Sequence, residues 1–289
     1  MRAQTYPNIV ETLVIDGGSS DATVAIAGSA PGVRLLTNDR RLQAAAMNRA
    51  IERATGEIIV RVDGRSALAA DYVERCVEAL GATGAAMVGG AIDPVGDTPA
   101  QRGIAAAMRS RFGTGPARFH GAATAAWTDT VYLGAFRVDA ARAAGGYDAT
   151  KPVNEDAEFA LRLGNHGGVW YDPRIRSTYR PRPSLGALAR QFFAYGRGRA
   201  DTIVRHPGSL RPRQLAAPLL LLAGISPWRR RVALVYAGAV AASAVRATRD
   251  ELDALPVALL ALPTIHLAWG VGFWTGLTDR LVRRRGRSC

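Results

Sequence analysis

Two acidic side chains follow directly after apolar runs that have the composition of buried strands. Asp16 ends the run 11–16 and opens a turn that continues with Gly17, and Asp63 follows the run 57–62. Ligands of open α/β sheets bind beyond the carboxyl ends of the strands, where a carboxylate can accept hydrogen bonds from a base or a ribose. An ordinary capped turn from strand to helix is the alternative interpretation of the first motif.

Arg65 lies two residues beyond Asp63, so a carboxylate and a cation stand at the same predicted strand end. A bound nucleotide diphosphate needs its negative charge compensated, either by a metal ion held on carboxylate oxygen or by arginine. The sequence leaves both possibilities open, and an Asp–Arg pair on the surface explains the motif as well.

Acidic residues also open the predicted helix 154–165, where Asn154 precedes Glu155 and Asp156. An asparagine N-cap and an acidic first turn complement the helix dipole, which is a complete structural explanation. A carboxylate held ionised at a helix N-terminus is also suited to act as a general base that deprotonates a hydroxyl. Glu155 and Asp156 point in different directions on a helix, so at most one of them faces a given site.

A basic and aromatic segment, 190–199, combines Gln191 and Arg197 with further arginines and with phenylalanine and tyrosine rings. Such a segment offers hydrogen bonds, stacking faces and cations, which suit a sugar or a diphosphate. A basic helix that lies on anionic lipid beside a membrane is the competing interpretation.

The elements that must position these residues alternate in the way that is typical of a βαβ-type domain. Strands are predicted at 11–16, 33–36, 57–62 and 86–92, near 131–136 and near 169–171. Helices are predicted at 41–55, 71–81, roughly 99–112, 154–165 and 184–205. The sequence therefore predicts an α/β fold for residues 1–208.

The composition changes near residue 209, where long apolar runs begin. A helix at about 215–226 is too short to span about 30 Å of hydrocarbon and is predicted to lie along the membrane interface. Runs at about 232–247 and 255–278 are predicted to form a spanning hairpin, because the arginines at 229–231 and 280–287 flank it as the positive-inside rule requires. An all-soluble protein whose last helices form a core is the alternative.

The 289 residues carry 37 Lys and Arg against 24 Asp and Glu, and the resulting net charge of +13 favours an anionic partner. The arginines cluster beside the apolar runs and no recognition motif is present, which argues against nucleic acid. The two cysteines exclude a disulfide framework and a four-cysteine zinc site, and they indicate a reduced, cytosol-facing compartment.

In their order along the chain, these motifs resemble those of a family 2 glycosyltransferase with the GT-A fold. The resemblance rests on the turn at Asp16, on Asp63, on the sequence 145–148 leading into Glu155 and Asp156, on Gln191 with Arg197, and on the membrane helices that follow. The segments 129–137 and 266–270 make the chain most similar to the succinoglycan-biosynthesis subgroup. The resemblance covers about residues 4–277.

The resemblance implies a GT-A (nucleotide-diphospho-sugar transferase) fold with a mixed sheet over residues 1–208, followed by C-terminal membrane helices over 209–289. It implies a membrane-associated inverting enzyme that moves a sugar from a nucleotide-sugar donor to a lipid-linked or polysaccharide acceptor in cell-surface polysaccharide synthesis. The expected partners are this donor, this acceptor and membrane lipid. The catalytic domain is expected to face the cytoplasm at the inner membrane.

The same resemblance implies roles for individual residues. Asp156 matches the family's catalytic base, and Glu155 matches the partner of that base. The implied donor-binding residues are Asp16, Gly17, Asp63 and Arg65, and the implied acceptor- or diphosphate-binding residues are Gly134, Arg137, Gln191 and Arg197. Asp63 matches the first position of the family's Asp-x-Asp motif, which implies a Mg²⁺ or Mn²⁺ cofactor, although Arg65 stands where the second carboxylate belongs.

The family opens with a strand and a helix before the position that matches Gln4, so the resemblance implies that this chain lacks them. One alternative is therefore a non-catalytic member that binds nucleotide sugar or joins an assembly, inactivated by N-terminal truncation. A nucleotidyltransferase of similar fold is a further alternative, but it accounts neither for a base at Asp156 nor for the membrane segment.

Overall fold

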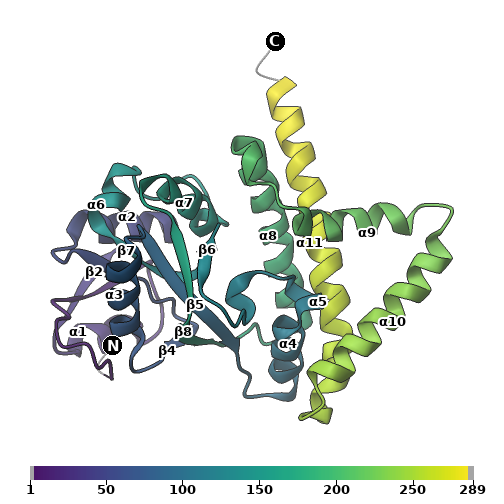
Figure 1. Ribbon diagram of the computed structural model, residues 1–289, viewed down its shortest axis with the longest axis horizontal. Coiled ribbons are helices and arrows are strands. Elements are labelled where there is room, and N and C mark those ends of the chain that lie inside the picture. The colour runs from purple at the N-terminus through teal and green to yellow at the C-terminus, as the bar shows by residue number, and fades with distance from the viewer. Residues whose placement is uncertain (1–2, 286–289) are drawn as a thin grey trace. The chain divides into compact units, whose positions relative to one another are not determined.

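The computed structural model describes residues 3–285, with side chains described through residue 282. The chain forms two compact units, each built from two stretches of sequence. The first comprises residues 1–92 and 121–177, and the second comprises residues 93–120 and 178–289 (Figure 1). Of the predicted membrane-flanking arginines, Arg287 lies outside the described residues, as do the side chains of Arg283, Arg284 and Arg285.

The first unit begins with a two-stranded parallel sheet. Strands β1 (Thr12–Asp16) and β2 (Val33–Thr37) pair along their whole length, and helix α1 (Thr23–Ser29) connects them. The amide of Asn38 donates to the carbonyl of Asp16 at 2.7 Å, which continues the ladder to the end of β1. The pairing therefore fixes where the chain leaves the sheet at Asp16.

A second sheet has six strands, in the order β3-β7-β5-β8-β4 with β6 beside β8. These strands are β3 (Ile58–Val60), β4 (Ser66–Leu68), β5 (Met87–Pro94), β6 (Ala126–Thr128), β7 (Tyr132–Arg137) and β8 (Val169–Tyr179). Strand β7 runs antiparallel to both β3 and β5, whereas β1 and β2 are parallel. The predicted α/β fold with mixed strand directions is confirmed.

Helix α3 (Tyr72–Thr83) packs on this sheet. Its apolar residues recur at spacings of three and four, which places them on one face. That face and residues of β5, β7 and β8 form a core whose members include Tyr72, Cys76, Ala79, Leu80, Val88, Ala135 and Ile175. Gly84 ends the helix in a left-handed conformation with φ 67°. Three further helices complete the unit: α2 (Gln43–Arg53), α6 (Val138–Ala143) and α7 (Glu155–Leu163).

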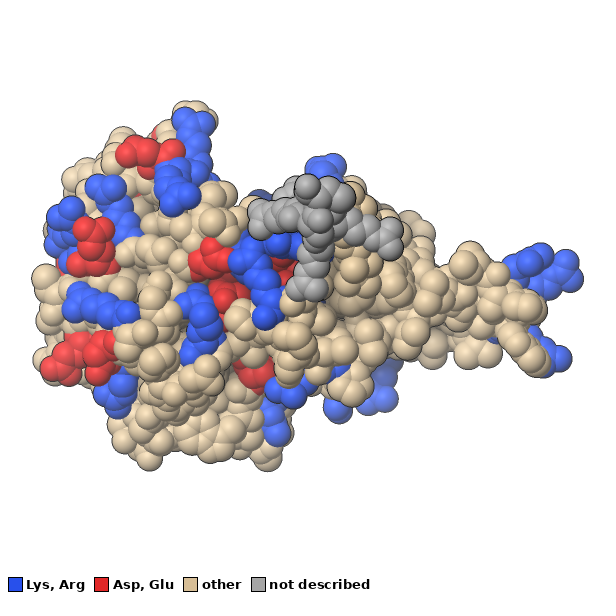
Figure 2. Space-filling view, turned by 90° about the horizontal axis from the view of Figure 1, so that it is seen from above, with Lys and Arg blue, Asp and Glu red and all other residues tan. Residues whose placement is uncertain are grey.

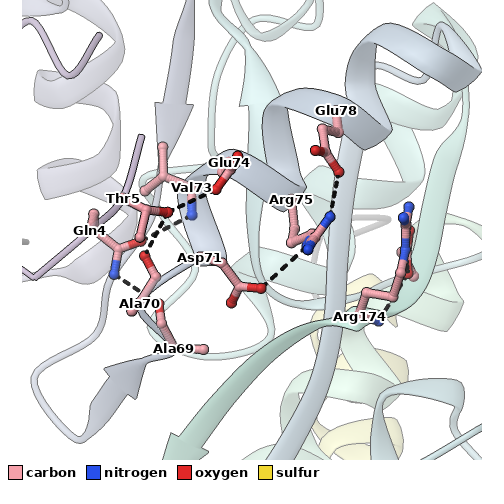
Figure 3. A network of polar contacts seen from close by, with 11 residues as sticks. Gln4, Thr5, Ala69, Ala70, Asp71, Val73, Glu74, Arg75, Glu78 and Arg174 are labelled. Carbon is pink, nitrogen blue, oxygen red and sulfur yellow. Dashed lines mark hydrogen bonds and ion pairs between the residues drawn. The ribbon is translucent and has the colours of Figure 1, made fainter. Parts of the chain in front are cut away.

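The start of the described chain is tied to α3 and to the turn before it (Figure 3). The side-chain amide of Gln4 donates to the carbonyl of Ala69 at 2.8 Å, and its oxygen accepts from the amide of Val73 at 3.0 Å (Figure 3). The Thr5 hydroxyl donates to Glu74 at 2.8 Å. Gln4 thus satisfies an amide of the first helical turn, which a helix cannot pair by itself.

The middle of β7 leaves ordinary strand geometry. Leu133 and Gly134 have φ of 58° and 86°, and the pairing of β7 with β5 shifts register between Val88 and Gly90. The positive φ at residue 134 favours glycine, and a Cβ atom there would also require the flexible end of the Met87 side chain to move.

The second unit is mainly helical, with α11 (Leu255–Arg285) in contact with all its other α-helices. Those helices are α4 (Pro99–Arg109), α5 (Arg111–Thr114), α8 (Leu185–Arg205), α9 (Ala216–Gly224) and α10 (Arg229–Ala247). At Gly196 of α8 and at Gly272 and Gly276 of α11, an added Cβ atom would meet the backbone of the other helix. Small residues therefore let these two helices approach closely.

Among the residues that the structure describes, one helix is long and apolar enough to cross a membrane. It covers Leu252–Val282, and its most apolar 18-residue window has a mean hydropathy of 1.7. A third of its most apolar window is buried inside the protein, and core helices of soluble proteins can meet the same criteria. The other predicted span forms helix α10. This helix carries arginines at 229–231 and at 246 and does not meet the criteria for a membrane-spanning helix.

The predicted strands and long helices are present, with ends shifted by a few residues. Residues 99–112 form two helices because Ser110 is extended, with ψ 129°, and its hydroxyl accepts from the amide of Phe112. Strand β8 runs beyond the predicted end at Tyr171 and reaches Tyr179. The three-residue strands β4 and β6 were not predicted. The compact units do not follow a single cut at residue 209, since α4 and α8 precede that residue and pack with α11.

Candidate active site

A buried arginine lies at the centre of the acidic residues that the sequence singles out. Arg61 follows β3 and is 5% exposed. Its Nε donates to Asp63 Oδ1 at 2.8 Å and one terminal nitrogen donates to Asp63 Oδ2 at 3.0 Å. The same terminal nitrogen lies 3.6 Å from Glu155 Oε1, at the start of α7. The structure thus brings the predicted residues Asp63 and Glu155 together through an arginine that was not predicted as a site residue.

The distortion in β7 positions this arginine. The amide of Arg61 donates to the carbonyl of Gly134 at 3.1 Å, so the β3–β7 ladder continues one residue beyond the strand. Gly134, a predicted site residue, therefore lies beside the acidic cluster and contributes to it through its backbone.

The loop before α7 is held by one asparagine of α2. The Asn48 side-chain amide donates to the carbonyl of Tyr147 at 2.8 Å, and its oxygen accepts from the amide of Tyr147 at 2.6 Å. The Tyr147 ring stacks on Phe159 of α7, with ring centroids 4.0 Å apart. These contacts fix the direction from which the chain enters α7.

The start of α7 differs from the predicted cap. Asn154 occupies the N-cap position but has φ 61°, and its side chain does not cap the helix. A capping side chain normally goes with an extended backbone, which this residue lacks. Glu155 is buried, whereas Asp156 is half-buried and its Oδ1 accepts from the next amide, that of Ala157, at 2.7 Å.

Burial and neighbouring charges change the protonation of Glu155. Burial first, and then the negative charge of Asp156, raise the pKa of Glu155 to about 7 and outweigh the opposing effect of Arg61. Near neutral pH, a large fraction of Glu155 is therefore protonated. The pair then carries less negative charge than two carboxylates would, as expected for an acid and a base placed side by side.

The pKa of Glu155 predicts a pH-dependent stability that Glu155→Gln should remove. Because the pKa is raised from 4.5 to about 7, the folded state holds the proton more tightly than the unfolded state. Stability should therefore fall as pH rises through this window, by on the order of 3 kcal/mol. Denaturant unfolding in detergent, from about pH 5 to about pH 8, should show this loss in the parent and a shallower slope in Glu155→Gln. Equal slopes would contradict the assignment.

The Gly-rich turn at Asp16 is built around the carboxylate itself. The amide of Gly18 donates to Asp16 Oδ2 at 2.8 Å, and the amide and hydroxyl of Ser19 also donate to the carboxylate. These bonds, with the Ser19 hydroxyl first, lower the pKa of Asp16. The following helix α1 has Ala22 at its N-cap, while Asp21 accepts from the amide of Thr23. Gly17 lies in the same turn, against the backbone of Arg41.

The residues around Asp63 do not fit a divalent metal ion held by the protein. Both carboxylate oxygens accept from Arg61, and Oδ1 also accepts from the Gln43 side-chain amide at 3.0 Å. Arg65 places a cation where a second carboxylate would be needed, and Mg²⁺ and Mn²⁺ require oxygen ligands. Within residues 3–285, no group of three or more His, Cys, Asp and Glu side chains could hold a metal ion.

Three predicted residues have contacts outside the acidic cluster. Arg137 lies at the far end of β7, where its guanidinium donates to the carbonyl of Leu80 in the last turn of α3 at 3.0 Å. In the second unit, the buried side-chain amide of Gln191 donates to the hydroxyls of Tyr179 and Tyr195. Arg197, which is half-exposed, forms an ion pair with Asp279 of α11 at 2.8 Å.

The sequence did not identify Arg61, Gln43 and Asn48 as residues of the site. Arg61 directly follows the apolar residues of β3 and is buried, and an arginine at the end of an apolar run is a signal because burying its charge requires a paired carboxylate. Gln43 and Asn48 gave no comparable signal, since polar residues on an amphipathic helix are ordinary.

Comparison with known proteins shows which family the sequence matches. A sequence model described as Glycosyl transferase family 2 matches residues 1–143. Succinoglycan biosynthesis protein ExoA of Rhizobium meliloti is 35% identical over 300 residues, which cover 99% of this chain and 90% of that protein. A dolichyl N-acetyl-alpha-D-glucosaminyl phosphate 3-beta-D-2,3-diacetamido-2,3-dideoxy-beta-D-glucuronosyltransferase of Methanococcus voltae is 25% identical over 207 residues, covering 67% of this chain and 64% of that protein.

Among solved structures, the mannosyltransferase PcManGT of Pyrobaculum calidifontis, in complex with GDP-Man and Mn²⁺, has a similar fold. The TM-score is 0.60 at 20% identity, and the match covers 96% of this chain and 81% of that one. At this level of identity the likeness shows the fold alone, and it confirms the predicted GT-A fold.

Proposed function

Because this chain belongs to glycosyltransferase family 2, we propose that it moves a sugar from a nucleotide-sugar donor to a lipid-linked or polysaccharide acceptor in cell-surface polysaccharide synthesis. The observation that carries the proposal is the cluster of Arg61, Asp63 and Glu155, with Asp156 beside it at the N-terminus of α7. The relatives support the acceptor class, since one is named for succinoglycan biosynthesis and another acts on a dolichyl phosphate sugar.

In the proposed reaction, the carboxylate of Asp156 takes the proton of the acceptor hydroxyl as its oxygen bonds to the anomeric carbon. The bond from that carbon to the β-phosphate oxygen breaks, and the nucleoside diphosphate leaves from the opposite face, which inverts the anomeric configuration. Glu155, partly protonated near neutrality, keeps the local negative charge beside Asp156 low.

The remaining roles are proposed from the resemblance of the sequence motifs to those of the family. Asp16 and Gly17 are proposed to contact the nucleoside, Asp63 and Arg65 the ribose and diphosphate, and Gly134 the acceptor. Gln191 and Arg197 are proposed to contact the diphosphate or the acceptor sugar, and for Arg197 this would require sharing or leaving its pair with Asp279.

We further propose that residues 209–289 hold the enzyme at the cytoplasmic face of the inner membrane, with residues 1–208 as the catalytic domain. In this arrangement 215–226 lies in the interface, and 232–247 with 255–278 forms the hairpin. Large apolar side chains on α10 and just after α9 are exposed, among them Ile225 at 80% and Leu234 and Val235 at 75%. Basic side chains gather where α10 begins (Figure 2), since the arginines 229–231 form the first turn of that helix. Apolar flanks with a basic end suit an anionic lipid surface.

A labelling experiment tests the proposal. Membranes and soluble fractions from cells that express the chain are incubated with a panel of radiolabelled nucleotide sugars, with cells lacking the chain as control. We expect one donor to label a lipid or polysaccharide product, and the activity to sediment with membranes. A folded chain that binds nucleotide but transfers label from no donor would indicate the non-catalytic alternative. Activity confined to the soluble fraction would contradict the membrane proposal.

A further inference from the structure

Arg65 presents an exposed guanidinium close to Asp63 in the sequence. Its side chain is exposed and makes no hydrogen bond or ion pair with any residue of the described range 3–285. Its backbone is held in a turn in which the amide of Ser66 donates to the carbonyl of Asp63 at 2.9 Å. The Ser66 hydroxyl also lies 2.6 Å from the hydroxyl of Tyr132 on β7. The Arg65 guanidinium is therefore unpaired within the described range, and it lies two residues after Asp63 in a hydrogen-bonded turn.

Arg41 presents a second such guanidinium, beside the Asp16 turn. Its side chain likewise has no hydrogen-bond or ion-pair partner in the part of the chain that the structure describes. The Arg41 guanidinium lies 3.3 Å from the position that a Cβ atom of Gly18 would take, and the Arg41 Cα lies 3.7 Å from that of Gly17. Arg41 therefore lies against the Gly-rich turn that Asp16 organises.

The backbone at Arg41 is also strained. It has φ 53°, a left-handed conformation in which a non-glycine side chain is disfavoured, and it begins the approach to α2. Such strain persists only where the surrounding structure imposes it, and it concentrates at ligand-binding sites. Two residues further on, Gln43 donates to Asp63, so the same short segment touches both the Asp16 turn and the Asp63 carboxylate.

The charges around Asp63 leave these two arginines without a counter-ion. The carboxylate of Asp63 already accepts two bonds from Arg61, and that of Asp16 is bound by its own turn. An anion that carries more than one negative charge is therefore the missing partner. A diphosphate fits, since planar guanidinium groups bind phosphate oxygens through paired hydrogen bonds.

We propose that Arg41 and Arg65 bind the donor diphosphate and stabilise the departing nucleoside diphosphate, in the place of a divalent metal ion. The inference rests on the proposed transferase function. As the bond from the anomeric carbon to the β-phosphate oxygen breaks, its electron pair stays on the phosphate. The two cations are then placed to stabilise the charge that develops there.

Calorimetric titration of the full detergent-solubilised chain with UDP and with GDP tests this, each in EDTA and in Mn²⁺. The parent is expected to bind one of these nucleotides with similar affinity in both conditions. Arg41→Ala and Arg65→Ala should each weaken binding about ten- to one-hundred-fold, as loss of hydrogen bonds to a charged group does. Arg65→Lys, which keeps the charge, should bind more tightly than Arg65→Ala. Arg53→Ala, which removes an exposed arginine paired only with Glu52, should bind like the parent.

Two results would overturn the inference and leave the transferase proposal standing. One is parent binding that requires Mn²⁺ and is abolished by EDTA. The other is parent-like binding by both alanine variants in EDTA. If neither nucleotide binds with or without Mn²⁺, while circular dichroism shows a folded chain, then the proposed use of a nucleotide-sugar donor fails as well.

Discussion

Asp156→Asn is expected to lower the rate of sugar transfer by about 10²–10⁴-fold, the usual contribution of a general base. The amide is nearly isosteric with the carboxylate but cannot take the acceptor proton. Its oxygen can still accept from the amide of Ala157, which Asp156 does at 2.7 Å, so the start of α7 should keep its geometry. Initial rates of label transfer at saturating donor and acceptor give the measurement.

Asp139→Asn provides a matched control. Asp139 lies in the first turn of α6, and its Oδ1 accepts from the next amide, that of Ala140, also at 2.7 Å. It differs from Asp156 in being exposed and remote from the Arg61 cluster. Asp139→Asn should transfer label at the parent rate. Equal rates for Asp156→Asn and the parent would show that another group takes the proton.

Arg61→Met is expected to destabilise the first unit by about 3–5 kcal/mol, the usual cost of removing one partner of a buried ion pair. The substitution preserves apolar bulk but leaves Asp63 and the buried Glu155 without their shared cation. Denaturant unfolding in detergent measures the change. The loss should shrink as pH falls through about 7, because protonation of Glu155 then removes its need for a counter-ion.

The control for this prediction is Arg75→Met. Arg75 also pairs with two carboxylates, Asp71 at 3.2 Å and Glu78 at 2.9 Å (Figure 3), but it lies on the surface of α3. Exposed pairs of this kind contribute about 0–1 kcal/mol. Equal losses in the two variants would show that burial of Arg61 is not what makes its pairing important.

The sequence predicted the fold well where a periodic pattern and a clear boundary coincide. Strands ending at Asp16 and near Asp63, and the helix that begins with Glu155, could be located because apolar residues give way there to charged ones. The strands β4 and β6 could not, since three residues are too few for alternation to be recognised.

The site was only partly predictable, for reasons of geometry. The pairing of Arg61 with Glu155 joins distant parts of the chain, and no local pattern specifies such a contact. The left-handed backbone at Leu133 and at Arg41 opposes the preference of those residues, so it arises from the folded environment. The predicted span 232–247 placed the arginines 229–231 outside the helix as a flank, whereas helix α10 begins at Arg229 and includes them.

The strand order has a consequence for synthesis on the ribosome. In the six-stranded sheet, β7 lies between β3 and β5, and β8 lies between β5 and β4. A nascent chain therefore presents the apolar edges of β3 and β5 well before the strands that cover them are translated. Unpaired edges of this kind promote aggregation. Recombinant production should therefore improve at slower elongation or with added chaperone, and fragments that end before Tyr132 should be insoluble.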